Sequence, residues 1–176
     1  PETKFIANFL LSRVGPAAPH LLQVNPFESR KGVFSSLSGL KEMYKIIEEG
    51  GAVCILPAGE VSTKYDNNNF VEDRDWQENI MKFIKSSGAP VISGFVSGKN
   101  SKTFHFLGRI NPALRTARLP AEFLNKKNLE IDVRFSHVLS PKVIKSIEDN
   151  KKLATVLKSR TYLLETDCCS ECEPKP

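Results

Sequence analysis

The pattern of apolar positions predicts two amphipathic helices, at residues 35–49 and 76–86. In each segment apolar residues recur every three or four positions, which is the spacing of one helix face. Gly50-Gly51 follows the first segment and Ser87-Gly88 follows the second, and glycine commonly ends a helix. The two apolar faces consist of Leu37, Leu40, Met43, Tyr44 and Ile47, and of Trp76, Ile80, Phe83 and Ile84.

Short apolar runs between turn residues predict β-strands. Residues 4–11 fit a short strand that leads into a helix, and residues 21–24, 52–56 and 89–96 fit buried strands. Residues 129–138 alternate strictly between apolar and polar, which predicts a half-buried strand. Because a helix, a glycine turn and a buried strand follow one another, we expect an α/β fold with a central mixed, largely parallel sheet flanked by helices.

Length and composition predict one domain. The chain has 176 residues, of which 40% are hydrophobic and 26% are charged, as is usual for a globular protein. No linker divides it, so we expect a single α/β domain over residues 1–165 and a flexible, cysteine-containing tail over 166–176. The chain starts with Pro1 and its first residues already have the pattern of a strand, so we expect it to be a piece of a longer protein.

The net charge of +5, from 25 Lys and Arg against 20 Asp and Glu, favours anionic partners. No dense basic block and no RNA-recognition or zinc-finger spacing is present, so we do not expect nucleic acid among these partners. The three histidines lie far apart, and neither a His-Glu-x-x-His motif nor a Gly-x-x-x-x-Gly-Lys phosphate loop occurs. We therefore expect no metal and no resident cofactor.

The segment at residues 104–124 combines basic and apolar residues. Residues 104–110 fit a short strand or a helical turn, and Pro112 and Pro120 limit the length of any helix that follows. The basic residues are either ordinary surface charges or part of a face that rests on an anionic membrane surface. These basic residues are Arg109, Arg115 and Arg118.

The cysteines suggest a second hypothesis about metal. Cys54 lies in an apolar run and is interpreted as a small buried residue. Cys168, Cys169 and Cys172 lie close together in the polar tail and indicate a reducing compartment more than a disulfide framework. Three such thiols could hold a soft metal if a fourth ligand joined them.

The segment at residues 53–62 is the strongest candidate for a functional site. Its apolar run stops at Pro57-Ala58-Gly59-Glu60, which places a turn and a lone carboxylate after a buried strand. Asn25 and Arg30 follow another short apolar run. Ligands of open α/β sheets bind outside the carboxyl ends of the strands, so both groups could line one edge of one sheet. Alternatively, Glu60 binds only nearby backbone N–H groups, Asn25 forms a turn and Arg30 is a solvated charge.

Three strings of residues, in this order and spacing, resemble a known family. They are Asn25-Pro-Phe-Glu-Ser-Arg30, Ile55-Leu-Pro-Ala-Gly-Glu60-Val-Ser62 and Gly88-Ala-Pro-Val-Ile92. Over residues 4–140 the chain resembles the glycerolipid (PlsC-like) acyltransferases, in particular the bacterial branch labelled hemolysin-like or lysophospholipid acyltransferase-like. The resemblance implies the C-terminal part of that family's domain, with the N-terminal part missing.

The resemblance implies an enzyme that transfers a fatty acyl group from acyl-CoA or acyl carrier protein to the hydroxyl of a lysolipid. In the family, the histidine of a His-x-x-x-x-Asp motif deprotonates the hydroxyl and the aspartate orients the histidine. The resemblance also implies a cytoplasmic protein that is peripheral at the inner face of the membrane. The implied acceptor-binding residues are Asn25, Arg30, Pro57, Gly59, Glu60 and Ser62.

The chain departs from the family pattern in its catalytic motif. None of its three histidines is followed by Asp five positions later, so no catalytic residue is assigned in this chain. His20 directly precedes the strand at 21–24, which is the wrong end for a base that serves the predicted site. The simplest explanation is that the chain begins after the motif; the alternative is a catalytically inactive module that binds lipid or an acyl carrier. Loss of the first strand would leave an open sheet edge through which the chain could self-associate.

The second departure concerns the acceptor. The commoner family string is Pro-Glu-Gly-Thr followed by Arg, and here Ala58, Glu60 and Val61 replace the Glu, the Thr and the Arg. This removes a cation from the implied phosphate site. An acceptor whose headgroup is not a simple phosphate, such as an amino-acid lipid, is therefore an alternative to a lysophospholipid.

Overall fold

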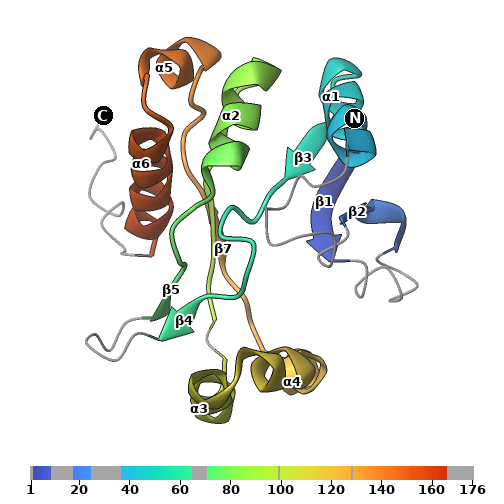
Figure 1. The fold of residues 1–176 in the computed structure, drawn as a ribbon, viewed down its shortest axis with the longest axis vertical. Helices are drawn as coiled ribbons and strands as arrows, with labels where there is room; N and C mark the ends of the chain where they lie inside the picture. Colours follow the sequence, from blue (N-terminus) through green and yellow to red (C-terminus); the bar gives the residue numbers. More distant parts are fainter. Residues whose placement is uncertain are drawn as a thin grey trace, which may run out of the picture. The chain divides into compact units, whose positions relative to one another are not determined.

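The structure is a computed structural model of the chain, and it describes residues 2–8, 18–24, 37–64, 71–98, 100–127 and 129–165 (Figure 1). These residues form two compact units. The first unit comprises Pro1–Glu60, Asp75–Val91 and Val138–Val156, and the second comprises Val61–Arg74, Ile92–His137 and Leu157–Pro176. The predicted tail at 166–176, with its three cysteines, lies outside the described residues.

The first unit contains a small parallel sheet. Its strands are β1 (Thr3–Asn8), β2 (Leu21–Val24) and β3 (Ala52–Cys54), in the order β2-β1-β3. Both pairings are parallel, and Phe5 of β1 lies opposite Leu21 on one side and Cys54 on the other. Helices flank this sheet, so the expected α/β class with parallel strands is confirmed.

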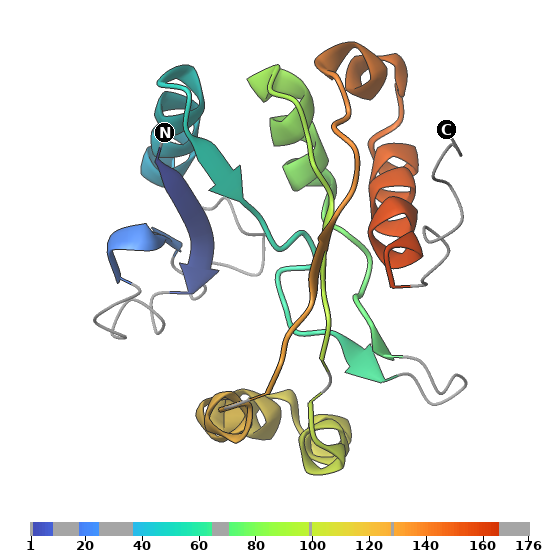
Figure 2. The same ribbon diagram turned by 180° about the vertical axis from the view of Figure 1, so that it is seen from behind.

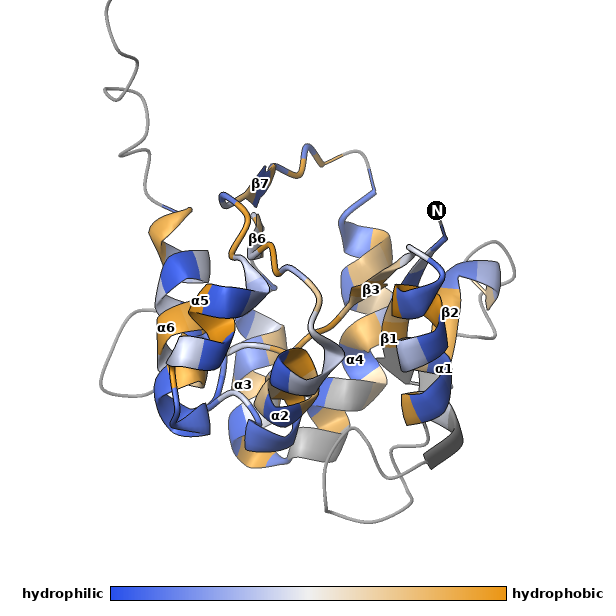
Figure 3. Cartoon of the chain, turned by 90° about the horizontal axis from the view of Figure 1, so that it is seen from above, coloured by the Kyte–Doolittle hydropathy of each residue, from blue (hydrophilic) through white to orange (hydrophobic). Residues whose placement is uncertain are grey.

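Two helices of the first unit turn the predicted apolar faces toward its core, and Met43, Ile80 and Phe83 of these faces are buried. These helices are α1 (Leu37–Glu48) and α2 (Glu78–Ser87), and Gly88 ends α2 in a left-handed conformation with φ of 63°. Figure 3 shows how apolar and polar residues alternate around α1. Tyr44 of α1 stacks edge-to-face on Phe83 of α2, with ring centroids 5.0 Å apart, and its hydroxyl lies 2.5 Å from Ser86 Oγ. The core cluster is Ile6, Leu22, Met43, Ile46 and Phe83.

The first unit is completed by α5 (Pro141–Ser146) and by the start of α6 (Asn150–Leu163), because the boundary between the units falls within α6. Ser140 caps α5 by accepting a hydrogen bond from the Val143 N–H. Lys85 Nζ of α2 donates to the carbonyl oxygen of Glu148, at 2.7 Å. Fully buried side chains from these elements are Ile80, Met81, Ile144 and Leu153.

The second unit contains two antiparallel strand pairs. Figure 2 shows the same ribbon from behind, with the segments that carry β6 and β7 running side by side. β4 (Thr63–Lys64) pairs with β5 (Val71–Glu72), within a segment that the sequence gives as polar loop. β6 (Gly94–Val96) pairs with β7 (Val133–Phe135). In the described part of the chain, the strands therefore form three separate small sheets where one central sheet was predicted.

The prediction of a half-buried strand at 129–138 is wrong in both length and burial. β7 has three residues, and its apolar side chains, Val133 and Phe135, are exposed while Arg134 between them is half-buried. The packed face of this strand pair is the one that carries Arg134 and its partner on β6, Phe95. The ring of Phe95 contacts that of Tyr162 edge-to-face, with ring centroids 6.4 Å apart. Arg134 Nη1 donates to the Leu164 carbonyl oxygen at 3.0 Å. The inward-facing residue of β7 is therefore a polar one, where the alternating pattern predicts apolar residues.

Two helices complete the second unit, α3 (Lys102–Ile110) and α4 (Pro112–Asn125). The alternative of a strand at 104–110 is therefore wrong. Pro112 starts α4, as expected for proline, but Pro120 lies inside the helix and does not end it. Two residues after Pro120, the Glu122 carboxylate accepts hydrogen bonds from the Ser101 N–H and hydroxyl. These bonds attach the last turns of α4 to the start of α3, so the helix continues beyond Pro120.

Candidate functional site

A tight turn follows β3 in the first unit. The Gly59 N–H donates to the Leu56 carbonyl oxygen at 3.0 Å, which closes a four-residue turn with Pro57 at its second position. Proline favours that position because its φ is already fixed near the value the turn needs. Gly59 has a φ of 71°, a conformation that side chains with a Cβ rarely adopt. The Pro57-to-Gly59 backbone is thus set by its own residues.

The start of α2 holds this turn from one side. The Gln77 N–H donates to the Pro57 carbonyl oxygen at 3.1 Å, and its side-chain amide donates to the Ala58 carbonyl oxygen at 3.4 Å. Gln77 immediately precedes Glu78, the first residue of α2. Because Gln77 binds the carbonyl oxygens of Pro57 and Ala58, the backbone of the turn, including Gly59, has a fixed geometry.

The parallel sheet gives this turn its position. The turn lies just beyond the carboxyl end of β3, and Asn25 directly follows the carboxyl end of β2. Because β2 and β3 both run parallel to β1, their carboxyl ends lie at the same edge of one sheet, with Asn8 of β1 opposite Val24 of β2. Asn25 and Arg30 themselves lie outside the described residues, so their position beside the turn stays a prediction.

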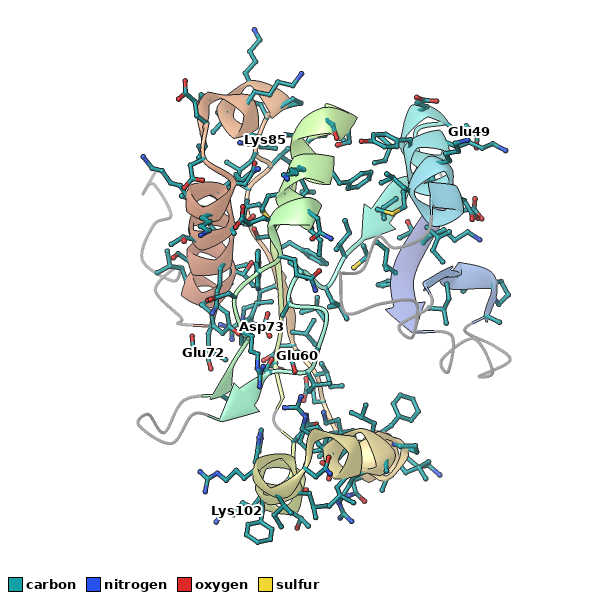
Figure 4. All side chains as sticks on the ribbon, viewed as in Figure 1. Glu49, Glu60, Glu72, Asp73, Lys85 and Lys102 are labelled. Atoms are coloured by element: carbon teal, nitrogen blue, oxygen red, sulfur yellow. The ribbon has the colours of Figure 1, made fainter. Side chains whose placement is uncertain are left out.

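The turn ends in an exposed carboxylate. Gly59 and Glu60 are exposed, and Pro57 and Ala58 are half-buried. The Glu60 side chain is labelled in Figure 4. Leu56, at the first position of the turn, is also exposed. A carboxylate can accept hydrogen bonds from a hydroxyl group or pair with an ammonium group. The turn therefore exposes both a hydrogen-bond acceptor, the Glu60 carboxylate, and an apolar side chain, Leu56.

Ser62 belongs to the second unit, in a group of polar side chains that we call the Asp73 cluster: Ser62, Glu72, Asp73, Lys158 and Tyr162. The Ser62 hydroxyl donates to Asp73 Oδ1 at 2.6 Å. The Asp73 N–H donates to the Tyr162 hydroxyl oxygen at 2.7 Å, and Lys158 Nζ donates to the Asp73 carbonyl oxygen at 2.6 Å. Lys158 Nζ also lies 3.4 Å from Glu72 Oε2.

The electrostatics of the Asp73 cluster keep Tyr162 neutral. Burial raises the pKa of the Tyr162 hydroxyl, and the charges of Asp73 and Glu72 raise it further. The backbone N–H of Asp73 and the hydroxyl of Ser62 lower this pKa, but they do not outweigh the other effects. A neutral phenol accepts from the Asp73 backbone and keeps its own proton. The cluster thus ties β5 to α6 within the second unit.

Sequence reasoning included Ser62 but missed the rest of the Asp73 cluster. Asp73 and Tyr162 are 89 positions apart, and Asp73 and Lys158 are 85 apart. No local pattern marks such residues as neighbours, and Asp73 falls in a segment that looks like an ordinary polar loop. Of the six predicted residues, Pro57, Gly59 and Glu60 lie in the first unit, Ser62 lies in the second, and Asn25 and Arg30 are not described.

His20 lies away from the carboxyl edge of the parallel sheet. It is the last residue of a short 3-10 helix, η2 (Ala18–His20), and directly precedes β2 at the strand's amino end. Its side chain is exposed. The same helix is attached to β1, because Lys4 Nζ donates to the Pro19 carbonyl oxygen at 2.5 Å. His20 is therefore held at the edge of the sheet opposite to the end where Asn25 follows β2.

Other candidate chemistry is weak in the described part of the chain. Within residues 2–165, apart from the gaps given above, no three His, Cys, Asp or Glu side chains gather in a way that could hold a metal ion. None of the helices described is both long enough and apolar enough to cross a membrane. Cys54 is half-buried on β3, and burial raises the pKa of its thiol, so the thiol stays protonated at neutral pH.

Comparison of the chain with models of known protein families, with curated protein sequences and with solved structures found no match. The function proposed for the chain therefore rests on its own residues and geometry and on the family resemblance that its residue strings carry.

Proposed function

We propose that this chain is part of a lipid acyltransferase of the glycerolipid (PlsC-like) type and binds the acyl acceptor at the carboxyl edge of its parallel sheet. One observation carries the proposal. The two residue strings that resemble the family's acceptor site follow β2 and β3, which are parallel strands of the same sheet. Ligand sites of open α/β sheets lie at this edge.

In this proposal the turn at 57–60 binds the headgroup of the acceptor. Gly59 lets the acceptor approach the backbone closely, since no Cβ stands in the way. The Glu60 carboxylate accepts a hydrogen bond from the acceptor, and Asn25 and Arg30 supply further polar contacts. Val61 is half-buried and apolar where a cation would hold a phosphate, so the acceptor is an amino-acid lipid or another lysolipid without a phosphate monoester.

The reaction itself needs a general base. A base takes the proton of the acceptor hydroxyl, the oxygen attacks the thioester carbonyl of acyl-CoA or acyl carrier protein, and the thiol leaves. His20 does not suit this role, because it lies at the amino end of β2. In this proposal the base is the histidine of the family's His-x-x-x-x-Asp motif, which these 176 residues do not contain.

The first test separates binding from catalysis. Binding of fluorescent lysolipids to the 176-residue chain would be measured with acceptors whose headgroups are a phosphate, a phosphodiester or an amino acid. We expect Glu60→Gln to weaken binding of the preferred lysolipid about tenfold, as for loss of a hydrogen bond to a charged group. The matched control is Glu49→Gln, an exposed glutamate at the end of α1.

Acyl transfer would then be followed as thiol release from acyl-CoA, with this chain and with a longer chain that supplies the histidine motif upstream. We expect turnover from the longer chain alone. Unchanged lysolipid binding in Glu60→Gln would remove the site assignment. Turnover by the 176-residue chain that His20→Ala abolishes would show that the base lies within it. Binding without turnover in either chain would favour a catalytically inactive lipid-binding module.

A further inference from the structure

The positive charge of this chain is concentrated in one segment. Residues 98–127 contain seven Lys or Arg and one acidic residue, Glu122, which gives a net charge of +6. The whole chain carries +5, so all other residues together carry −1. In the structure this segment forms α3 and α4 of the second unit. A charge this localised acts on a partner as a patch, over a distance of about 8–10 Å in physiological salt.

The single acidic residue of this segment does not offset the patch. Glu122 is only 3% exposed. Its two carboxylate oxygens accept hydrogen bonds from the Ser101 N–H and hydroxyl at 2.8 and 2.6 Å, and Arg118 Nε lies 3.5 Å away. Ser101 in turn caps α3 by accepting a hydrogen bond from the Phe104 N–H at 3.1 Å. The negative charge is thus bound inside the unit. Among the described cations of the segment, Lys102, Arg109 and Lys127 are exposed, whereas Arg118 and Lys126 are half-buried and Arg115 is buried.

The outer face of α3 combines cations with large apolar side chains. Lys102, Phe106 and Ile110 are exposed and lie four positions apart, and the exposed Arg109 lies three positions after Phe106, so all four share one side of the helix. Lys102 marks the start of this face in Figure 4. Phe106 and Ile110 are 59% and 62% exposed, whereas Phe104 on the inner face is fully buried. α3 therefore has a buried apolar side chain on its inner face and exposed apolar side chains on its outer face.

The end of α4 repeats this combination. Phe123 is 75% exposed and Leu124 is 69% exposed, and the exposed Lys127 follows them. Lys126 is positioned by a hydrogen bond to Asn100 Oδ1 at 2.7 Å. The two helices are packed closely, because a Cβ on Gly108 of α3 would lie 2.9 Å from Arg115 Cδ of α4. The exposed apolar side chains therefore stand on an ordered helix pair.

We propose that α3 and α4 dock on an anionic lipid bilayer. Lys102, Arg109 and Lys127 contact the acidic headgroups, and Phe106, Ile110, Phe123 and Leu124 insert at the boundary between headgroups and acyl chains. Basic residues near an anionic membrane and apolar side chains in its interface both favour binding, and they do so together. The proposal stands on charge and exposure alone and does not depend on acyl transfer.

Other occupants fit this surface less well. A second copy of the chain would bring two segments of net charge +6 together, and like charges repel. Single-stranded nucleic acid would be attracted by the cations and could stack on the phenylalanines. The aliphatic side chains of Ile110 and Leu124, however, cannot stack with bases, whereas they suit an acyl-chain environment. A lipid surface suits both the exposed cations and the exposed apolar side chains of α3 and α4.

The experiment is vesicle co-sedimentation of the 176-residue chain. Vesicles contain phosphatidylcholine alone or with about 30% phosphatidylglycerol, and NaCl is varied from about 50 to about 500 mM. We expect binding to the anionic vesicles at least about tenfold tighter than to the neutral ones, and weaker binding as salt rises. Equal binding to both vesicles, or no binding to either, would overturn the proposal.

Two pairs of variants localise the surface. Phe123→Ser should weaken binding about tenfold, because an inserted aromatic side chain is lost. Its control is Phe135→Ser on β7, where a phenylalanine is 70% exposed without the basic patch. Lys102→Gln with Lys127→Gln should weaken binding about 25-fold, at about fivefold for each cation. Its control is Lys41→Gln with Lys142→Gln, which removes two exposed lysines of the first unit.

The controls also define failure. Circular dichroism first shows that each variant is folded, which is expected because all these side chains are exposed. Loss of binding in the control pairs to the same extent would show that the patch has no special role. Binding of single-stranded RNA without binding of vesicles would assign the patch to nucleic acid. Dimers that Phe123→Ser dissociates, again without vesicle binding, would assign it to a second copy.

Discussion

The two units of this protein are built by different interactions. Of the twelve hydrophobic side chains that are buried among the described residues, ten belong to the first unit. All three buried polar side chains of the described residues, Ser93, Arg115 and Glu122, belong to the second unit. Twelve of the sixteen large hydrophobic side chains that are exposed in the described residues also belong to the second. The first unit thus buries its apolar side chains, and the second leaves most of its own at the surface.

This difference has a physical consequence for what each unit can do. Apolar burial is non-directional and stabilises a unit in proportion to the area removed from water. Hydrogen bonds between buried polar groups are directional and expensive to leave unmade. In the second unit, hydrogen bonds of the buried Glu122 and of the half-buried Asp73 tie its elements together, while most of its large apolar side chains face solvent. The first unit instead provides a fixed frame for the turn at 57–60.

The largest expected effect is the loss of core packing in the first unit. Ile80 is fully buried on α2, so Ile80→Ala should lower the free energy of unfolding by about 2–5 kcal/mol. The measurement is urea unfolding followed by the fluorescence of Trp76, which is the single tryptophan of the chain and lies in the first unit. Ile110→Ala on α3, where the side chain is 62% exposed, is the matched control and should change the value by less than about 0.5 kcal/mol. If Ile80→Ala and Ile110→Ala lowered the free energy of unfolding equally, the proposed difference in apolar burial between the two units would be wrong.

Apolar periodicity predicted the elements of the first unit well, and the core explains why. In α1 and α2 most residues that repeat at helical spacing are buried or packed against the core, so local pattern and tertiary burial largely agree. Ile46 and Met81 are buried although they were not on the predicted faces. Met43 and Phe83 were on the predicted faces and are buried. The strand at 21–24 has the predicted bounds, while the strand predicted at 52–56 ends at Cys54 because the turn begins at Leu56.

The same reasoning failed in the second unit, because there the pattern and the burial disagree. The alternation at 129–138 is real in sequence, but its apolar members Val133 and Phe135 are exposed. Pro120 looks like a helix end, and Glu122 holds the helix beyond it through Ser101, 21 positions away. Polar contacts between residues so far apart leave no trace in a local window of sequence.

The candidate site was predictable only as far as it is local. The turn at 57–60 is marked by its own proline and glycine, and its place after a strand follows from the apolar run before it. The support from Gln77 could not be foreseen, because the segment before α2 has no distinctive pattern. Ser62 was assigned to the acceptor site because the family resemblance implies it, yet its hydroxyl donates to Asp73 in the second unit.

The second prediction tests whether buried hydrogen bonds order the second unit. Burial alone would raise the pKa of Glu122, but the hydrogen bonds from Ser101 and the nearby Arg118 outweigh it, so its pKa is lowered from the ordinary value of 4.5. Glu122→Gln should therefore destabilise α3 and α4 by about 1.5–3 kcal/mol at pH 7. The measurement is hydrogen exchange of peptides from residues 100–127, with exposed Glu130→Gln as the control.

The pH dependence of this effect has a definite sign. A carboxyl group whose pKa is lower in the folded state stabilises the fold above the unfolded pKa and loses this contribution as pH falls through the folded value. The wild-type protein should therefore lose the contribution of Glu122 below about pH 4.5, and the difference from Glu122→Gln should shrink there. A difference that stays constant from pH 7 to about pH 3 would mean that the carboxylate charge is not what stabilises the helix pair.

The smallest expected effect concerns Ser62, and it separates a structural role from a binding role. Ser62→Ala removes the hydrogen bond to Asp73 from a half-buried position and should lower stability by about 1 kcal/mol, seen as faster hydrogen exchange in peptides from 61–74. The control, Ser159→Ala on the exposed side of α6, should be neutral or slightly stabilising, because alanine favours helix. If Ser62 only anchors the Asp73 cluster, lysolipid binding should stay unchanged in Ser62→Ala while Glu60→Gln weakens it. A loss of binding in Ser62→Ala without faster exchange would instead make Ser62 part of the acceptor site, as the resemblance implies, and would show that the Asp73 cluster serves binding as well as stability.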